Sequence, residues 1–137
     1  MGGALRATTQ TPMTTPERPD MIKATVMTDA RSHDIGEPKI KETSVTAGQT
    51  EASVRLWGRD GEATGIWEVT PGTFKSTRPG FDEVCYILSG EGTITEPDGT
   101  SFELRPGTLF VTPSGWEASW TVRETLRKVW FTSQLPA

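Results

Sequence analysis

Hydrophobic and polar residues alternate in short runs along most of this chain, and turn residues separate the runs. The runs are rich in β-branched and aromatic residues, which favour strands, and no window keeps the spacing of a helix. Asp-Gly at 60–61 and Pro-Asp-Gly at 97–99 predict hairpin-type turns. The predicted strands cover residues 52–57, 64–70, 83–88, 92–96, 101–104, 108–112, 117–122 and 126–132. Many short strands at this spacing predict an all-β sandwich or closed barrel.

The first twenty residues differ from the rest of the chain. They are rich in Thr, Pro and Gly, with almost no large apolar side chain beyond Leu5. Such a segment buries too little apolar surface to offset the entropy lost on ordering. We expect residues 1–20 to form a flexible tail and residues 21–137 to form one folded domain, because 137 residues suffice for one core but not for two of ordinary size.

A pattern of glycines and one glutamate resembles the first sequence motif of the cupin barrels. In that motif a glycine is followed by two histidines, a glutamate and a second glycine. Gly72, Glu83 and Gly90 match its glycine and glutamate positions. The two histidine positions hold Arg78 and Gly80 instead. The chain therefore has the skeleton of the motif without its histidine ligands.

The second cupin motif is matched in the same incomplete way. Gly107, Pro113 and Gly115 occupy its glycine and proline positions, and Ala118 stands where the motif has a histidine. Three of the four usual metal ligands of a cupin are thus absent. The resemblance implies the fold and argues against its commonest chemistry.

The residues around both motifs resemble one subgroup of cupins, the DUF861 family, which includes EutQ-type and (S)-ureidoglycine aminohydrolase-type proteins. The resemblance lies in residues 65–72 (GIWEVTPG), in residues 82–88 (DEVCYIL) and in the pair Arg127-Lys128. It implies a single cupin barrel, that is, a double-stranded β-helix or jelly roll. The chemistry of the ureidoglycine enzymes depends on metal ligands that this chain lacks, so that reaction is not carried over.

Two charged residues are the predicted catalytic centre. The resemblance directs Glu83 into the barrel, where burial would raise its pKa unless a cation stabilised the carboxylate. Lys128 is the natural partner if its face of the last strand also points inward, and a desolvated lysine can act as a base or form a Schiff base. Alternation along the strand does not fix that face, because the register is unknown. The alternatives are a structural ion pair or rim position for Glu83 and a solvated lysine.

Five further residues are predicted to bind substrate. A guanidinium at the barrel mouth can clamp a carboxylate, although a surface arginine is an equal alternative. The cysteine shares the face of Glu83 by alternation and is expected to be a small buried residue rather than a nucleophile. Tryptophans beside the vacated histidine position are expected to wall the pocket. The five residues are Arg78, Cys85, Trp116, Trp120 and Trp130.

No metal site and no cofactor are predicted. The metals of cupins are commonly bound by two or more histidines, and the single histidine, His33, lies far from both motifs. Glu83 and Cys85 on one strand do not complete a site by themselves. A metalloenzyme that borrows ligands from its substrate is the remaining metal-dependent alternative.

Composition and charge narrow the class of partner. The net charge of −4 provides no basic field for nucleic acid or an anionic membrane, and no apolar run is long enough to span a bilayer. The single cysteine excludes an internal disulfide and is compatible with a reducing compartment. We expect a cytoplasmic protein that binds a small molecule and neither nucleic acid nor membrane. Small cupins often bury aromatic outer surfaces, so a homodimer is also expected.

These observations predict that the protein binds a small polar metabolite bearing a carboxylate or an amide without a metal ion. A stronger hypothesis is that it also catalyses a reaction of this metabolite. The alternative is a noncatalytic binding or assembly module, as EutQ-type cupins work within a larger enzyme system and also lack the usual histidines. The orientation of Lys128 distinguishes the two. An inward Lys128 beside Glu83 favours an enzyme, and a solvent-facing pair favours a module.

Overall fold

The computed structural model describes residues 21–136, and every regular element in that range is a β-strand. The all-β expectation is therefore confirmed, while the predicted tail, residues 1–20, lies outside the described residues. The described part of the chain contains no helix with the length and apolar character needed to cross a membrane. The strands are β1 (Lys39–Ile40), β2 (Thr50–Arg59), β3 (Glu62–Val69), β4 (Gly72–Thr77), β5 (Phe81–Thr95), β6 (Ser101–Leu104), β7 (Leu109–Thr112) and β8 (Glu117–Gln134).

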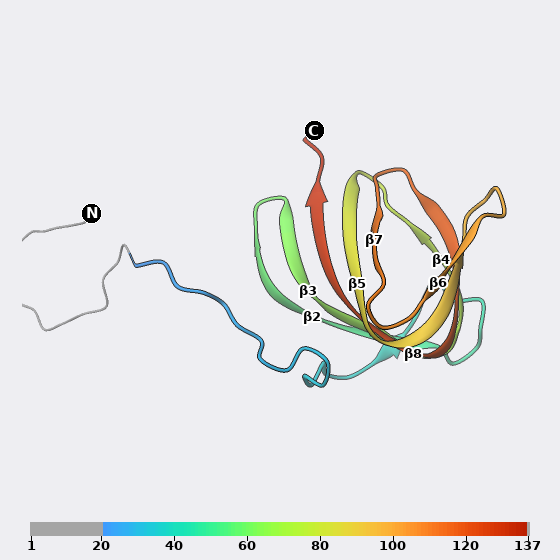
Figure 1. Cartoon of the computed structure of the whole chain (residues 1–137), viewed down its shortest axis with the longest axis horizontal. Coiled ribbons are helices and arrows are strands. Elements are labelled where there is room, and N and C mark those ends of the chain that lie inside the picture. Colours follow the sequence, from blue (N-terminus) through green and yellow to red (C-terminus); the bar gives the residue numbers. More distant parts are fainter. Residues whose placement is uncertain (1–20, 137) are drawn as a thin grey trace, which may run out of the picture.

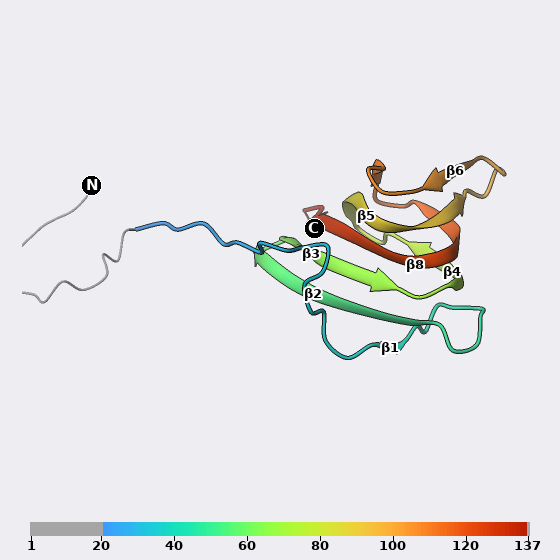
Figure 2. The same ribbon diagram turned by 60° about the horizontal axis from the view of Figure 1, so that its bottom comes forward.

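Two long strands, β5 and β8, form the centre of one antiparallel sheet with the order β1-β2-β3-β8-β5-β6. The free edge of β8 pairs with β4 along its first half and with β3 along its second half. The free edge of β5 pairs with β7 and then with β6. The sheet curls, so that β2 and β3 lie on one side of the interior and β6 and β7 on the other (Figures 1 and 2).

The central strands are longer than the sequence pattern predicts, because neighbouring predicted runs merge. The expected runs 83–88 and 92–96 are one strand, β5, and the last two expected runs are both part of β8. β5 stays continuous because register shifts between Ile87 and Gly92 let it bend against β8. Gly90 lies at this bend with φ of 98°, and a Cβ there would collide with the carbonyl oxygen of Thr125. The predicted runs include neither β1 nor β4.

Alternation along β5 places the Cys85 side chain on the inner face with Glu83, as predicted. Cys85 and Ile87 are fully buried, whereas Val84 and Tyr86 are exposed on the outer face. Phe74 of the unpredicted strand β4 stacks on Trp120 with 5.3 Å between ring centroids. The main core cluster consists of Val69, Phe74, Ile87, Ile94, Leu104, Ala118, Trp120, Val122 and Leu126. This core fills one end of the curled sheet and leaves the other end open for a site.

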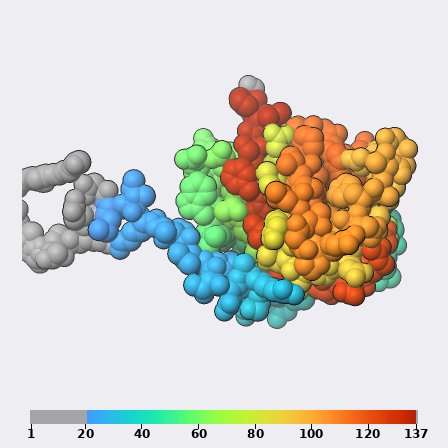
Figure 3. Space-filling view, in the orientation of Figure 1, coloured from blue at the N-terminus to red at the C-terminus, as the bar shows by residue number. Residues whose placement is uncertain are grey.

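Two regions of the outer face of the sheet differ: one is covered by the segment before β1 (Figure 3), and the other is exposed. The segment before β1 lies against the body of the protein (Figure 3), where Arg127 donates to the carbonyl oxygens of Ala30 and His33 and pairs with Glu68. The outer face of β5 and β7 instead exposes apolar side chains, among them Tyr86 and Val111. The expected homodimer stays a prediction, which a mass measurement in solution would test.

Candidate functional site

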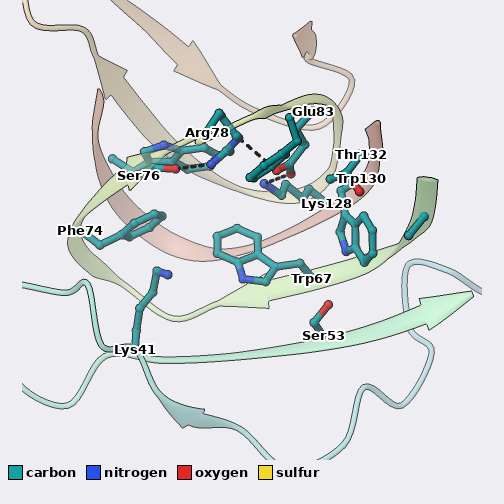
Figure 4. A pocket seen from close by; sticks show the side chains of 13 residues that line it. Lys41, Ser53, Trp67, Phe74, Ser76, Arg78, Glu83, Lys128, Trp130 and Thr132 are labelled. Carbon is teal, nitrogen blue, oxygen red and sulfur yellow. Dashed lines mark hydrogen bonds and ion pairs between the residues drawn. The ribbon is translucent and has the colours of Figure 1, made fainter. Parts of the chain in front are cut away.

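The open end of the curled sheet contains a cavity of about 380 Å³. Its wall is built from β2, β3, β4, β5, β8 and the residue that follows β1, so segments from most of the chain meet there (Figure 4). The lining residues are Lys41, Ser53, Ala63, Trp67, Phe74, Ser76, Arg78, Phe81, Glu83, Trp120, Lys128, Trp130 and Thr132.

Glu83 lies at the centre of a buried charge cluster. Its Oε2 is 2.8 Å from Lys128 Nζ, and its Oε1 is 3.1 Å from Arg78 Nε. The three side chains are only 6–10% exposed. Lys128 is paired across the sheet with Ile87, so its long side chain runs along the inner face to reach Glu83. Lys128 therefore points into the barrel, which settles the orientation that alternation left open.

Two cations keep Glu83 ionised. Burial on its own would raise the pKa of Glu83. The positive charges of Lys128 and Arg78, together with hydrogen bonds from Lys128 and the Cys85 thiol, outweigh burial and hold the pKa below its ordinary value. Glu83 is thus a carboxylate at neutral pH and not the acid with a raised pKa that burial alone would make. Its role in the cluster is electrostatic.

Arg78 is held rigidly although it lies just beyond the end of β4. Its Nε also donates to Thr112 Oγ1 at 2.9 Å, and its Nη1 donates to Ser76 Oγ at 2.7 Å and to the carbonyl oxygen of Thr77. A guanidinium fixed through two nitrogens presents a planar set of donors in one orientation. The mobile surface arginine that the sequence left open is excluded.

The Lys128 ammonium packs between aromatic rings. Its Nζ lies 4.5 Å from the ring centroid of Trp67 and 4.8 Å from that of Trp120. Such contacts stabilise a desolvated cation by electrostatic attraction to the ring faces. Trp130 lines the cavity beside these rings. The aromatic side chains therefore fix the cation and leave its charge directed towards the cavity.

A second lysine reaches the cavity from a different part of the chain. Lys41 follows the two-residue strand β1, and its Nζ is 3.0 Å from Glu51 Oε1 and 4.4 Å from the ring centroid of Phe74. The same Glu51 oxygen accepts a hydrogen bond from Trp67 Nε1 at 2.9 Å. The sequence analysis did not identify Lys41, because nothing in its local pattern shows that β1 brings it to the barrel mouth.

Two residues predicted to bind substrate do not line the cavity. Cys85 is fully buried behind Glu83 and donates its S–H to Glu83 Oε2 at 3.4 Å. Burial raises the pKa of Cys85 to about 11, and the Glu83 charge adds to the rise while Lys128 opposes it. Trp116 packs outside the cavity, with its ring 5.4 Å from the Arg78 guanidinium and its Nε1 donating to Glu96. The structure thus places both behind the charged cluster.

The residues at this site do not fit the metal centre of other cupins. Arg78 occupies one of the vacated histidine positions, and its positive charge adjoins the carboxylate that a metal would need. Lys128 takes the other oxygen of Glu83. Two cations beside a single carboxylate repel a divalent metal ion. His33 is exposed in the N-terminal segment, and residues 21–136 contain no group of three or more His, Cys, Asp or Glu side chains that could hold a metal ion.

Structural and sequence comparisons agree on the fold. The EutQ protein of Clostridium difficile matches with a TM-score of 0.57 at 21% identity, covering 66% of this chain and 67% of that one. A DUF861 family protein of unknown function from Pseudomonas syringae matches with a TM-score of 0.61 at 18% identity, covering 72% of this chain and 43% of that one. Ectoine synthase from P. lautus matches with a TM-score of 0.57 at 20% identity, covering 69% of this chain and 67% of that one.

No curated protein sequence matches the chain. The family model described as the EutQ-like cupin domain matches residues 58–130, which include both incomplete motifs, Arg78, Glu83 and Lys128. This range is more than half of the chain and contains strands β3 to β7 and most of β8. The protein therefore belongs to the EutQ-like cupin domain family, and its curled sheet is a cupin barrel.

Proposed function

We propose that this cupin binds a small organic acid in its barrel without a metal ion. The observation that carries the proposal is the charge of the buried cluster. Two cations, Arg78 and Lys128, share one carboxylate, Glu83, so the cluster holds one positive charge in excess. An excess charge that is shielded from water is costly unless a partner neutralises it. A carboxylate in the cavity is such a partner, and an amide would satisfy the hydrogen bonds without the charge.

The rest of the cavity suits a ligand with a small carbon skeleton. Trp67, Phe74 and Trp130 provide apolar wall, while Thr132 and Ser53 add hydroxyl groups, of which that of Ser53 donates to the carbonyl oxygen of Ile66. A mostly apolar cavity with a few convergent polar groups is typical of sites for small metabolites. The volume of about 380 Å³ is at the lower end of the usual range for such sites, roughly 300–1,000 Å³.

Turnover of the bound acid is the second candidate, and the position of Lys128 favours it. Lys128 lies in the barrel beside Glu83, which is the arrangement that the sequence analysis associates with an enzyme. Glu83 is the weaker part of this hypothesis, because a carboxylate with a lowered pKa is a poor general acid at neutral pH. Binding alone, as in a ligand-responsive assembly module, requires neither residue to transfer a proton.

Binding can be tested with three four-carbon probes that differ only in the polar group: butyrate, butyramide and butylamine. We expect butyrate to raise the melting temperature and to shift the indole N–H signals of the cavity tryptophans in NMR spectra. Butyramide should bind more weakly, and butylamine should not bind. Lys128→Met should abolish butyrate binding, because it removes the excess charge and leaves Glu83 paired with Arg78.

Lys75→Met is the matched control, since Lys75 is exposed on β4 and is not part of the cavity wall. It should leave butyrate binding unchanged. Circular dichroism and a thermal melt of both variants separate a folding defect from a binding defect. The proposal fails if butyrate does not bind to the folded protein, if butylamine binds as well as butyrate, or if folded Lys128→Met protein keeps full affinity.

A further inference from the structure

The cavity has a second polar end, opposite the buried charge cluster. Figure 4 shows Lys41 across the cavity from Glu83 and Lys128, with the Trp67 ring between them and Phe74 to the side of Lys41. The Lys41 side chain is only 11% exposed, and its Nζ lies over the ring of Phe74. A lysine this buried, on a segment remote from both cupin motifs, is positioned by its surroundings and not by chance. A carboxylate bound at Lys128 and Arg78 would have its far end near Lys41, which lines the same cavity.

Lys41 provides hydrogen-bond donors without excess charge. Glu51 neutralises its ammonium at 3.0 Å and is itself fixed by the bond from Trp67 Nε1. An ammonium has three N–H donors, and among residues 21–136 Glu51 is the only acceptor that Lys41 Nζ bonds. The remaining donors face a cavity wall made of rings. This end of the cavity therefore suits a neutral oxygen acceptor, in contrast to the anion expected at Lys128.

The distance between the two ends limits the length of the ligand. Lys128 Nζ and Lys41 Nζ lie 4.5 and 5.8 Å from the same ring centroid, that of Trp67, so they are at most about 10 Å apart. Each hydrogen bond to a ligand oxygen spans about 2.8 Å of this distance. About 4.5 Å then remains between the two ligand oxygens, a spacing that one or two carbon atoms between the two oxygen-bearing groups provide, as in succinamate.

We propose that Lys41 determines specificity by selecting monocarboxylates that carry a neutral carbonyl or amide group at the far end of a short chain. The inference rests on the proposed function, because the carboxylate must first be held by Lys128 and Arg78. The ligand then carries one negative charge and two hydrogen-bond acceptor groups, one at each end of the cavity. A dicarboxylate would place a second negative charge beside Glu51, and a simple fatty acid would leave the Lys41 donors unused.

A series of four-carbon compounds tests the inference: butyrate, succinamate, succinate and succinamide. Succinamate combines one carboxylate with one terminal amide, and calorimetric titration should show that it binds about tenfold more tightly than butyrate, the effect of one charge-assisted hydrogen bond. Succinate and succinamide should both bind more weakly than succinamate. Lys41→Met should remove the advantage of succinamate over butyrate while leaving butyrate itself bound. Lys75→Met should preserve the whole order.

Glu51→Gln should shift the ligand preference towards a dianion, whereas Lys41→Met should remove the preference for a terminal amide. Without the Glu51 charge, Lys41 is no longer neutralised, so the preference should move from succinamate towards the dianion succinate. The inference is overturned if wild-type protein binds succinate most tightly, if succinamate binds no better than butyrate, or if folded Lys41→Met protein keeps the succinamate advantage. In each of these cases butyrate still binds and the proposed function stands. If none of the four compounds binds, both proposals fail.

Discussion

The two ends of the paired strands β5 and β8 have opposite distributions of polarity. At the cavity end the inner face carries charge, with Glu83 and Lys128 both buried. The outer face of the same strand segment is apolar, with Val84 and Tyr86 exposed to solvent. An amphipathic strand that obeyed the hydrophobic effect alone would show the reverse arrangement.

The closed end of the same two strands follows the ordinary rule. Ile94 and Trp120 are fully buried in the core. Outside them, Arg123 pairs with Glu103 at 2.7 Å and donates to Thr93 Oγ1 at 2.8 Å, all on exposed side chains. The fold therefore obtains its stability at the closed end, where apolar surface is buried and charges remain in water.

The contrast between the ends assigns different roles to their charges. Moving ions out of water costs free energy that a buried pair recovers only with good geometry, and apolar residues of similar volume often stabilise a fold as well or better. The Glu83 cluster contains three such ions. A cluster that stability does not require, and that lines a cavity, supports the proposal that the cavity binds a ligand. Substitutions at each end should reveal this difference.

Glu83→Gln should have the largest effect. The substitution leaves Arg78 and Lys128 buried beside each other with no anion between them, which should lower the free energy of unfolding by about 3–5 kcal/mol. Urea denaturation monitored by tryptophan fluorescence measures the change. Adding Lys128→Met to this variant removes one of the two unpaired cations and should restore part of the loss. A loss below about 1 kcal/mol, the size of an exposed ion pair, would contradict the assignment.

Much of this centre follows from the sequence, for a physical reason. The glutamate of the first motif fixes the inner face of its strand, and alternation then places Cys85 inside and Val84 outside. The orientation of Lys128 does not follow, because the pairing of β8 with β5 depends on register shifts at 87–92 that no single residue type specifies. Parity along one strand is a local property, whereas register is a property of two strands.

The positions of three other residues that the sequence pattern does not predict have similarly specific causes. Trp116 precedes the first residue of β8, so strand alternation does not apply to it. Its ring packs against the Arg78 guanidinium, outside the cavity. Cys85 lies on the predicted face, but the cavity ends at Glu83 and the thiol is behind it. Lys41 gives no local signal, because the two-residue strand β1 and the tertiary packing on Phe74 determine its place. Alternation therefore predicted the face of a strand residue, whereas contact with the cavity depends on tertiary packing that alternation does not describe.

Acid should weaken the cavity end in a defined pH range. The folded-state pKa of Glu83 lies below the ordinary value of 4.5, so its paired form contributes stability above that pH and loses the contribution as pH falls through the folded-state pKa. Unfolding free energies of wild-type and Glu83→Gln protein, measured between pH 7 and pH 3, should therefore differ most at neutral pH and converge below about pH 4.5. A difference that stays constant, or grows, towards low pH would show that the carboxylate charge is not what stabilises the cluster.

Arg123→Ala should have the smallest effect, although its ion pair at 2.7 Å is shorter than either contact of Glu83. Water already solvates Arg123 and Glu103, so breaking their pair leaves no buried charge behind, and the expected loss in urea denaturation is far smaller than that of Glu83→Gln. Raising the salt concentration should reduce even this loss, because exposed charges are screened. A loss as large as that of Glu83→Gln would mean that the exposed network at the closed end stabilises the barrel as much as the buried cluster. Distance alone would then govern both ends, and the cavity charges would no longer require a ligand to explain them.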